Sequence, residues 1–268
     1  MTPTSSPTST RQAYLSDLTD KEWEIIAPFL PKPKGFGHPR TVDLREVVNA
    51  IFYLIRSGCQ WEMLPHDFPH HSTVYNYFNK WKKKGIWQAI HDKLRVDVRE
   101  KAGKKAEATA ASADSQTVKT AEKRGRYGAL MGVSGIKGRK RHLVVDTLGL
   151  VMGVIVTQGN APERVGALMV LAEAEEKVGE LEILWVDQGY TGEKFAKAVE
   201  QVCGAKVEVI KRTQKEFERL PKRWIVERTF GWLNWYRRLS KDYELCPATS
   251  ETMIYGSMIR LMLRRLSA

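Results

Sequence analysis

Cysteine is scarce in this chain, and its three cysteines stand far apart, at positions 59, 203 and 246. A small, odd and dispersed set predicts neither a disulfide framework nor a zinc site. Long apolar runs are also missing, since arginines interrupt even the most apolar helical segment, 253–266. Residues 1–14 are rich in Thr, Ser and Pro and lack the apolar core of a signal peptide. We therefore expect a cytoplasmic protein with a disordered tail at 1–14 and no membrane partner.

Carboxylates are the second shortage, with 31 Asp and Glu against 43 Lys and Arg in 268 residues, a net charge of +12. Such an excess attracts polyanions, and nucleic acid is the leading candidate because neutralising phosphates releases counterions. An acidic membrane surface is the alternative, but the chain has no lipidation motif. The glycines of "GALMGVSGIKG" fit neither a Walker loop nor a dinucleotide fingerprint. We therefore expect a nucleic-acid-binding protein.

The first third, residues 15–100, has the pattern of a small all-α domain. Thr19 and Glu22 form a capping box, and apolar residues recur at helical spacing from 44 to 55. A third helix, capped by Ser72 or Thr73, has an apolar inner stripe and a polar, basic outer face that includes Asn76, Asn79, Lys80 and Lys83. This unit fits a helix-turn-helix-type DNA reader. A solvated lysine face on an ordinary bundle explains the same residues equally well.

Residues 101–108 look like a linker, and strands dominate the pattern in residues 109–268. A strand at 110–117 and a hairpin turning at 147–149 come first. The segments that follow are a helix, a buried strand, a helix, a strand and a long helix, at 162–178, 181–186, 191–202, 205–211 and 223–239. This order predicts an α/β domain whose mixed sheet is flanked by helices.

Three acids stand out by their positions. Asp114 lies near the end of the first strand of this domain, and Asp187 lies where the buried strand breaks into "DQGY". Ligand sites of α/β proteins form where the carboxyl ends of strands meet, although a lone acid there also serves to cap the next helix. Asp146 lies in the hairpin context "VVDTLG", so we interpret it as a turn former.

The third acid, Glu227, lies in the long helix. Its polar stripe covers an arc of about 80° and consists of Arg223, Glu227, Gly231, Asn234 and Arg238. A glycine in a helix interior costs about 1 kcal/mol, which is easiest to explain if something bulky approaches beside Glu227. A surface glutamate paired with Arg223 and Arg228 is the alternative.

Three converging carboxylates could hold two divalent cations. Mg²⁺ prefers oxygen ligands, and Mn²⁺ is a plausible substitute. Two ions about 4 Å apart can activate the attacking oxygen and stabilise the leaving oxygen of a phosphoryl transfer. Basic and polar side chains nearby would then hold the phosphodiester backbone, and the candidates are Arg139, Lys140, Arg141, His142, Lys211, Arg223, Arg228, Arg237 and Arg238.

Taken in order, the motifs resemble one family. The segments are "LTDKEWEIIAPFLP", "GCQWEMLPHDFP", "STVYNYFNKW", "DSQTVKT", "GRKRHLVVDTLGL", "WVDQGY" and "RWIVERTFGWLNWYRRL". Over residues 15–266 they look like bacterial insertion-sequence transposases of the insertion sequence five family, which are DDE transposases with a ribonuclease H-like catalytic fold. The resemblance implies that Asp114, Asp187 and Glu227 bind two Mg²⁺ ions.

The resemblance also implies the partners. These are double-stranded DNA, as the terminal inverted repeats and as the target, and a second copy of the chain in a homodimer or higher assembly on DNA. The expected place of action is the nucleoid of a bacterial cytoplasm. A non-catalytic DNA-binding regulator, a decayed transposase or a metal-dependent nuclease on the same fold are the alternatives.

The chain departs from the family around the glutamate. Arg223 and Glu227 match the signature, but Leu220 stands where a tyrosine is expected and Asn234 where a lysine is expected. The DNA-gripping role of that lysine is therefore not carried over to Asn234, and a neighbouring arginine is the expected substitute. Only 40 positions separate the last two acids, so we expect a catalytic domain without a large insertion.

Overall fold

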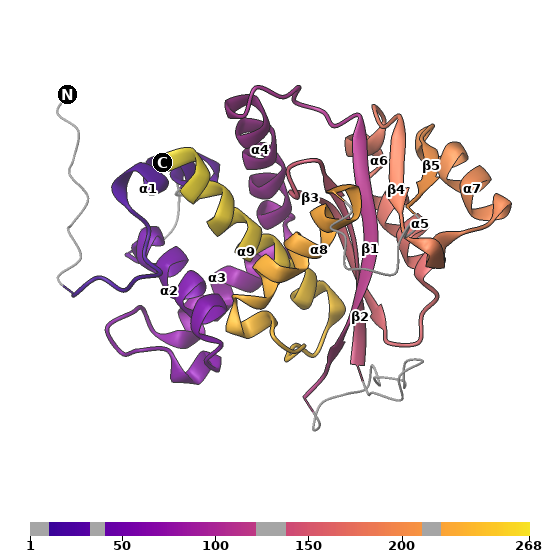
Figure 1. The fold of residues 1–268 in the computed structure, drawn as a ribbon. Coiled ribbons are helices and arrows are strands. Elements are labelled where there is room, and N and C mark those ends of the chain that lie inside the picture. The colour runs from indigo at the N-terminus through magenta and orange to yellow at the C-terminus, as the bar shows by residue number, and fades with distance from the viewer. Residues whose placement is uncertain (1–10, 33–40, 122–137, 211–220) are drawn as a thin grey trace.

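The computed structural model describes residues 11–32, 41–121, 138–210 and 221–268. Its amino-terminal part is helical, as predicted, and lies at one end of the molecule (Figure 1). The helices there are α1 (Asp20–Ile26), α2 (Leu44–Ser57), α3 (His71–Lys83) and α4 (Ile86–Lys101).

The ends of these helices follow from local sequence. The predicted capping box of α1 is confirmed, because the Thr19 side chain accepts from the Glu22 amide and the Glu22 carboxylate accepts from the Thr19 amide. Gly58, with φ of 76°, ends α2 as expected. The prediction for α3 is wrong by two residues or more: His70 is its cap, and the imidazole Nδ1 accepts from the Ser72 amide.

The sheet has the order β3-β2-β1-β4-β5. Its strands are β1 (Ala110–Lys119), β2 (Gly138–Asp146), β3 (Val151–Gln158), β4 (Ile183–Val186) and β5 (Lys206–Val209). β1, β2 and β3 pair antiparallel, whereas β4 pairs parallel with both β1 and β5. The predicted mixed sheet is confirmed. β1 is longer than predicted, so Asp114 lies at its middle rather than near its end.

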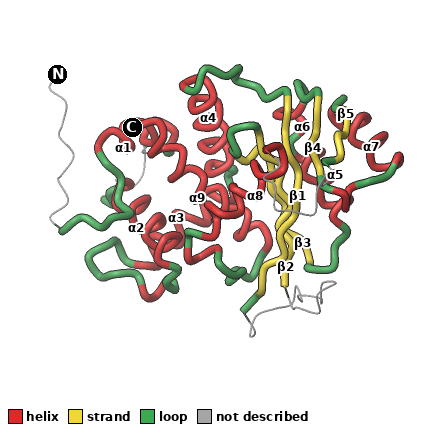
Figure 2. The backbone as a smooth tube through the Cα atoms, in the orientation of Figure 1, coloured by secondary structure: helices red, strands yellow, loops and turns green. Residues whose placement is uncertain are grey.

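Helices cover both faces of the sheet (Figures 1 and 2). One face packs on α5 (Glu163–Glu173), α6 (Glu175–Val178) and α7 (Glu193–Cys203), with Ala111, Ala113 and Val144 of the sheet in their core. The other face packs on α8 (Pro221–Asn234) and α9 (Pro247–Ser267), with Leu143 and Val145 in that core. Successive strand residues point to opposite faces, so each strand contributes to both layers.

The α8–α9 layer also packs on the amino-terminal helices. One continuous core joins α2, α4, α8, α9 and the sheet, and α9 contacts α1, α2, α4 and β3. Two buried ion pairs tie the parts together, Arg99 with Asp146 at 2.8 Å and Arg260 with Glu22. The boundary at 101–108 therefore separates kinds of secondary structure but not hydrophobic cores. Nowhere in the described ranges is a helix long and apolar enough to cross a membrane.

Arginines hold parts of two segments that the sequence predicts to be a disordered tail and a linker. Arg11 forms ion pairs with Asp17 and Glu46, both at 2.7 Å, and lies over the Phe68 ring. The predicted disordered tail is therefore wrong for residues 11–14, while residues 1–10 lie outside the described part. Within the expected linker, the backbone carbonyls of 105, 106 and 107 accept from Arg99, so 101–108 is anchored to α4.

Candidate active site

The pairing of β1 with β4 brings two of the three predicted acids to corresponding positions. Ala110 pairs with Ile183, and the ladder ends with Ser112 opposite Trp185. The same register, continued by two residues on each strand, sets Asp114 opposite Asp187. Neighbouring strands lie about 4.8 Å apart, and both aspartates are partly exposed. The sheet therefore supplies two adjacent carboxylates just beyond the point where β1 and β4 stop pairing.

Asp114 points to the face that α8 covers. It is opposite Leu143 in the antiparallel pair of β1 and β2, and opposite residues point to the same side of a sheet. Leu143 lies in the core with Phe230 and Leu233 of α8. Ala113, the preceding residue, lies in the core on the other face.

Asp187 caps the short helix that follows β4. Its Oδ1 accepts from the Gly189 amide at 2.8 Å, and the 3₁₀ turn η3 (Gln188–Tyr190) begins there. The capping role weighed from the sequence is thus present. Capping uses only Oδ1 of Asp187, so it does not exclude a second role for this carboxylate.

The third predicted acid, Glu227, comes from α8, which contacts β1, β2 and β4. Val226, Phe230 and Leu233 form the buried side of this helix, and Glu227 is exposed. Near the start of the helix, Lys222 forms an ion pair with Glu208 at 2.8 Å and lies over the Trp185 ring. This anchor places the start of α8 beside β4, the strand that Asp187 follows.

The turn of the β2–β3 hairpin fixes the rotation of α8. Thr229 Oγ1 donates to the Gly149 carbonyl at 2.8 Å, and Arg228 donates to the Leu148 carbonyl at 3.0 Å. Gly149 has φ of 78°, and an added Cβ would lie 2.9 Å from Thr229 Oγ1. Asp146 forms this turn, as predicted, by accepting from the amides of 148 and 150.

The exposed stripe of α8 is shorter than predicted. The helix ends at Asn234, because the amides of 235 and 236 bond three residues back and Tyr236 is extended. Gly231 faces open space, with no described atom within 4 Å of an added Cβ. No contact with the described residues therefore requires a glycine there.

The basic run at 139–142 does not form a DNA-contacting surface in this structure. All four side chains are buried, and strand alternation sends them to opposite faces. Lys140 donates to the Ala161 carbonyl, and His142 shares a hydrogen bond with Thr157 on the α5 side. Burial lowers the pKa of His142 to about 4, aided by the charge of Lys140 and opposed by Glu163.

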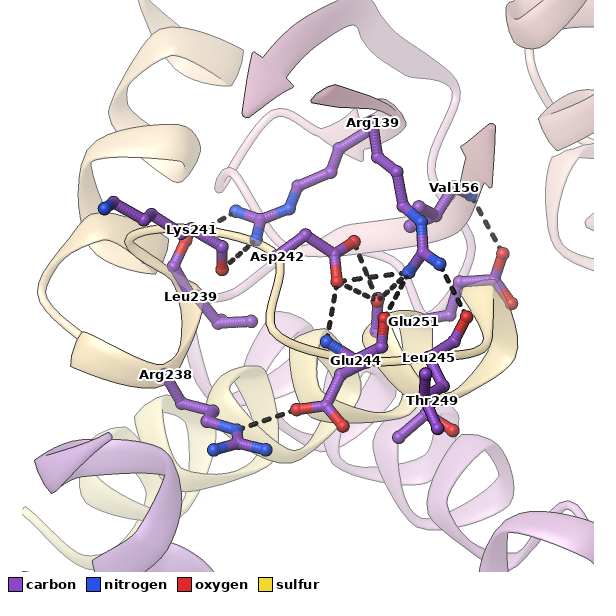
Figure 3. Close-up of polar contacts among 12 residues, drawn as sticks. Arg139, Val156, Arg238, Leu239, Lys241, Asp242, Glu244, Leu245, Thr249 and Glu251 are labelled. Carbon is purple, nitrogen blue, oxygen red and sulfur yellow. Dashed lines mark hydrogen bonds and ion pairs between the residues drawn. The ribbon is translucent and has the colours of Figure 1, made fainter. Parts of the chain in front are cut away.

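Arg139 and Arg141 instead hold the segment between α8 and α9. Figure 3 shows the contacts that Arg139 makes with Asp242 and the residues after it. Arg139 pairs with Asp242 at 3.1 Å and donates to the carbonyls of 244 and 245. Arg141 donates to the Leu239 carbonyl at 2.8 Å, and burial lowers its pKa to about 10. The expectation that Arg139, Lys140, Arg141 and His142 contact DNA is corrected, because all four side chains are buried inside the fold.

Two other arginines predicted to contact DNA, Arg238 and Arg228, make contacts within the protein. Arg238 is buried in the 3₁₀ turn η4 (Arg237–Leu239), where it pairs with Glu244 at 2.7 Å and donates to the Cys59 carbonyl. Arg238 does not lie on the predicted helical stripe, because α8 ends at Asn234. The expectation that Arg238 contacts DNA is therefore corrected. Arg228 lies between the rings of Trp224 and Trp232, 4.8 Å from each.

The remaining candidates are accessible or undescribed. On α3, Asn76, Lys80 and Lys83 are exposed and Asn79 is half-buried. Arg237 is exposed on η4. Lys211 and the side chain of Arg223 lie outside the described residues.

One acid near the site was missed from the sequence. Glu163, the first residue of α5, accepts from Ser115 Oγ at 3.1 Å and pairs with Lys140 at 3.4 Å. Its other oxygen faces Gly189, where an added Cβ would lie 3.1 Å from both Glu163 Oε2 and Asp187 Oδ1. An acid directly after Pro162 marks a helix start, and nothing in that signal indicates a neighbour of the two aspartates.

Tyr190 places a neutral hydroxyl among these acids. The residue is 1% exposed, and its oxygen makes no hydrogen bond of ordinary distance and angle with the described residues. Burial raises its pKa, and the charges of Asp114, Glu163 and Asp187 raise it further against the opposing effect of Ser115. The four groups are therefore close enough to interact electrostatically.

The donor set fits a hard cation. Carboxylate oxygens are the ligands that Mg²⁺ prefers, and the unbonded Tyr190 hydroxyl leaves a polar atom that a water on the ion could satisfy. As they stand, the described residues do not bring three His, Cys, Asp or Glu side chains close enough to hold a metal. A metal site made of the two aspartates and Glu227 would require these side chains to lie closer together than they do here.

Comparison with known proteins gives two family matches. Residues 18–91 match the family described as "Putative transposase of IS4/5 family". Residues 105–263, more than half of the chain, match the family described as "Transposase DDE domain". Both matches follow the order in which the motifs occur in the sequence.

Three curated relatives share parts of the chain. A putative transposase for insertion sequence element IS402 from Burkholderia cepacia is 29% identical over 133 residues, covering 46% of this chain and 60% of the relative. An uncharacterized 16.2 kDa protein of the same element is 25% identical over 108 residues, covering 38% and 72%. An uncharacterized protein of Sinorhizobium fredii (strain NBRC 101917 / NGR234) is 32% identical over 84 residues, covering 31% and 64%.

The fold agrees with these matches. A five-stranded mixed sheet of order β3-β2-β1-β4-β5, flanked by helices and preceded by a helical region, is the expected ribonuclease H-like arrangement. The chain therefore belongs to the insertion-sequence DDE transposases.

Proposed function

We propose that this protein binds the terminal inverted repeats of its insertion sequence, cleaves the transposon ends and joins the freed 3′-hydroxyls to target DNA. The observation that carries the proposal is the register of β1 and β4, which sets Asp114 opposite Asp187 on the face that α8 covers. Glu227 lies on the exposed side of that helix. Membership of the transposase family supports the same reaction.

Asp114 and Asp187 would hold two Mg²⁺ ions, and Glu227 would bind one of them, with Mn²⁺ as a plausible substitute. Such ions activate the attacking oxygen and stabilise the leaving oxygen of an in-line displacement. Other residues of the chain would position α8 and the DNA. The Gly149 turn and Lys222 hold α8 in place, while the space over Gly231 leaves room for the DNA backbone beside Glu227.

DNA recognition is assigned to residues 15–100 and chemistry to residues 109–268. The exposed polar side chains Asn76, Lys80 and Lys83 of α3, with half-buried Asn79, would read or hold the repeat. Arg237 is exposed beyond the end of α8 and would supply the charge that Asn234 lacks. Lys211 and Arg223 are further candidates by sequence. Two ends must join two target strands, so the active form is at least a dimer on DNA.

Replacing Asp187 with Asn tests the reaction. Loss of one metal-binding carboxylate removes several kcal/mol of transition-state stabilisation, so end cleavage in Mg²⁺ should fall by about a thousandfold. Binding to an inverted-repeat duplex should stay within about twofold, because recognition is assigned to another region. The control is Glu193→Gln on α7, whose side chain is 81% exposed. Cleavage by Asp187→Asn at the wild-type rate would remove this site from the reaction.

A strand-transfer assay separates the proposal from its alternatives. Precut ends, which already carry the 3′-hydroxyl, are incubated with target DNA and Mg²⁺. Joined product supports a transposase. Cleavage of uncut ends without joining indicates a nuclease, and binding without either product indicates a non-catalytic regulator or a decayed copy.

A further inference from the structure

The ladder between β1 and β4 does not reach the two aspartates. Pairing between these strands ends at Ser112 and Trp185, which leaves a gap two residues before each acid. Asp114 is held on its other side by pairing with Leu143 of β2, whereas β4 ends at Val186 and the one-turn helix η3 follows Asp187. Contacts outside the β1–β4 ladder can therefore set the spacing of Asp114 and Asp187.

The first turn of α5 lies in this gap and bonds to both sides of it. Glu163 Oε1 accepts from Ser115 Oγ at 3.1 Å, on the residue directly after Asp114. Arg164 Nε donates to the Gly189 carbonyl at 3.1 Å, in the turn directly after Asp187. Glu163 Oε2 lies beside the same turn, because an added Cβ on Gly189 would be 3.1 Å from this oxygen and from Asp187 Oδ1.

We propose that Glu163 and Arg164 are positioning residues that set the separation of Asp114 and Asp187 for the two-ion site. The proposal rests on the function proposed above and adds residues that the family's three acids do not include. Glu163 is assigned the role of a bridge, because its Oε1 accepts from Ser115 and Lys140 and its Oε2 lies against Gly189. Lys140 neutralises its charge at 3.4 Å, so the bridge does not compete with the aspartates for a cation.

The position of the bridge is set by close packing of α5 on β2. An added Cβ on Gly166 would lie 2.1 Å from the His142 ring, so the helix backbone lies directly on that ring. His142 is itself buried and shares a hydrogen bond with Thr157. Glu163 lies one turn before Gly166, and its reach to Ser115 is therefore fixed by a rigid contact.

The test compares Glu163→Ala with Glu163→Gln, which keeps the length and an acceptor oxygen for Ser115. Amide hydrogen exchange of residues 188–190 reports the held turn without any metal or DNA. In Glu163→Ala, which removes the carboxylate packed against Gly189 and its bond to Ser115, it should speed up about tenfold. In Glu163→Gln it should stay near the wild-type rate. Glu176→Ala, an exposed acid on α6, is the matched control.

End cleavage gives the second readout. Glu163→Ala should cleave about tenfold to a hundredfold more slowly, as expected for reacting groups misplaced by a fraction of an ångström to an ångström, and Glu163→Gln should keep most of the activity. A Gln variant as slow as the Ala variant, with normal exchange, would show a direct role of the charge and overturn the positioning role. Unchanged exchange in Glu163→Ala would also overturn it.

The failure of the proposed function looks different. If Asp187→Asn cleaves as the wild type does, the two-ion site is wrong whatever Glu163 does. Exchange at 188–190 still decides whether the first turn of α5 holds the turn after Asp187. Arg164→Ala provides a second variant for that readout, with faster exchange expected because its bond to the Gly189 carbonyl is lost.

Discussion

The two faces of the sheet hold their helices in different ways. On the α5–α7 face the helix backbone lies close to the strands, because two glycines let α5 approach: added Cβ atoms would lie 2.8 Å from Val170 at Gly153 and 2.1 Å from His142 at Gly166. On the α8–α9 face, long charged side chains are buried. Arg139 with Asp242 and Arg99 with Asp146 cross between the sheet and its covering elements.

The difference shows two ways of fixing a catalytic group. Close packing on a glycine sets a distance through hard contact, with little tolerance for added volume. A buried ion pair sets an orientation, although its desolvation cost offsets much of its attraction. The face with close packing carries Glu163, and the face with ion pairs carries Glu227. We therefore expect added side-chain volume to destabilise the protein mainly at the α5–α7 face, and removal of a buried charge to destabilise it mainly at the α8–α9 face.

The largest stability effect is expected from Arg99→Ala on the ion-pair face. The Asp146 side chain is fully buried, and removing its partner leaves an uncompensated charge that costs about 3–5 kcal/mol. Urea unfolding measures the loss. Lys93→Ala, in an ion pair at the surface of the same helix, should cost far less, because surface ion pairs contribute little to stability. Equal losses in the two variants would contradict the distinction drawn for this face.

The next effect is expected from Gly166→Ala on the close-packed face. The added methyl meets the His142 ring, and overpacking of this kind costs about 1–3 kcal/mol. In a His142→Ala background the same change should become neutral or stabilise by up to about 1 kcal/mol, because alanine favours the helix. A double-mutant cycle by urea unfolding measures the coupling. The contact is unimportant if the two changes simply add.

Protonation of His142 is expected to lower the free energy of unfolding by about 2 kcal/mol when the pH falls from 7 to 5. The folded pKa is about 4, below the usual value of about 6.5, so folding disfavours the charged ring. Its contribution is therefore fully present above pH 6.5 and is lost as the pH falls toward 4. Unfolding free energies of the wild type and His142→Asn across this range measure the difference. Parallel curves would show that the ring titrates normally.

The smallest stability effect is expected from Gly231→Ala on α8. The site is open, so alanine should stabilise the DNA-free protein by up to about 1 kcal/mol. If the DNA backbone passes beside Glu227, the added methyl should still slow end cleavage. Thermal unfolding and a cleavage assay measure the two effects, and a stabilised variant that cleaves normally would remove the reason for the glycine.

Much of the fold could be predicted because hydrophobic periodicity and turn residues are local signals. The order of strands and helices and the Asp146 turn were predicted in this way and are confirmed. The ribonuclease H-like class was implied by the resemblance to the transposase family, and it is confirmed too. The positions of the three acids on β1, after β4 and on α8 were predicted too. Their roles remain a prediction.

The errors came from charges whose surroundings are not local. The run at 139–142 was interpreted as surface, but it lies in β2, between β1 and β3, so alternation buries all four side chains. Arg238 was placed on a helical stripe, although α8 ends four residues earlier. Arg11 was assigned to a tail because its partners Asp17 and Glu46 belong to a fold that composition does not reveal. Glu163 was missed for the same reason.

The packing of α9 has a consequence for the order of synthesis. The amino-terminal helices leave the ribosome first, yet they share their core with a helix that begins at Pro247. Glu22 pairs with Arg260, near the other end of the chain. A nascent chain therefore carries its amino-terminal helices before it has the segment that completes their packing. Products truncated before α9 leave these helices without that partner, so their packing depends on the last helix of the chain.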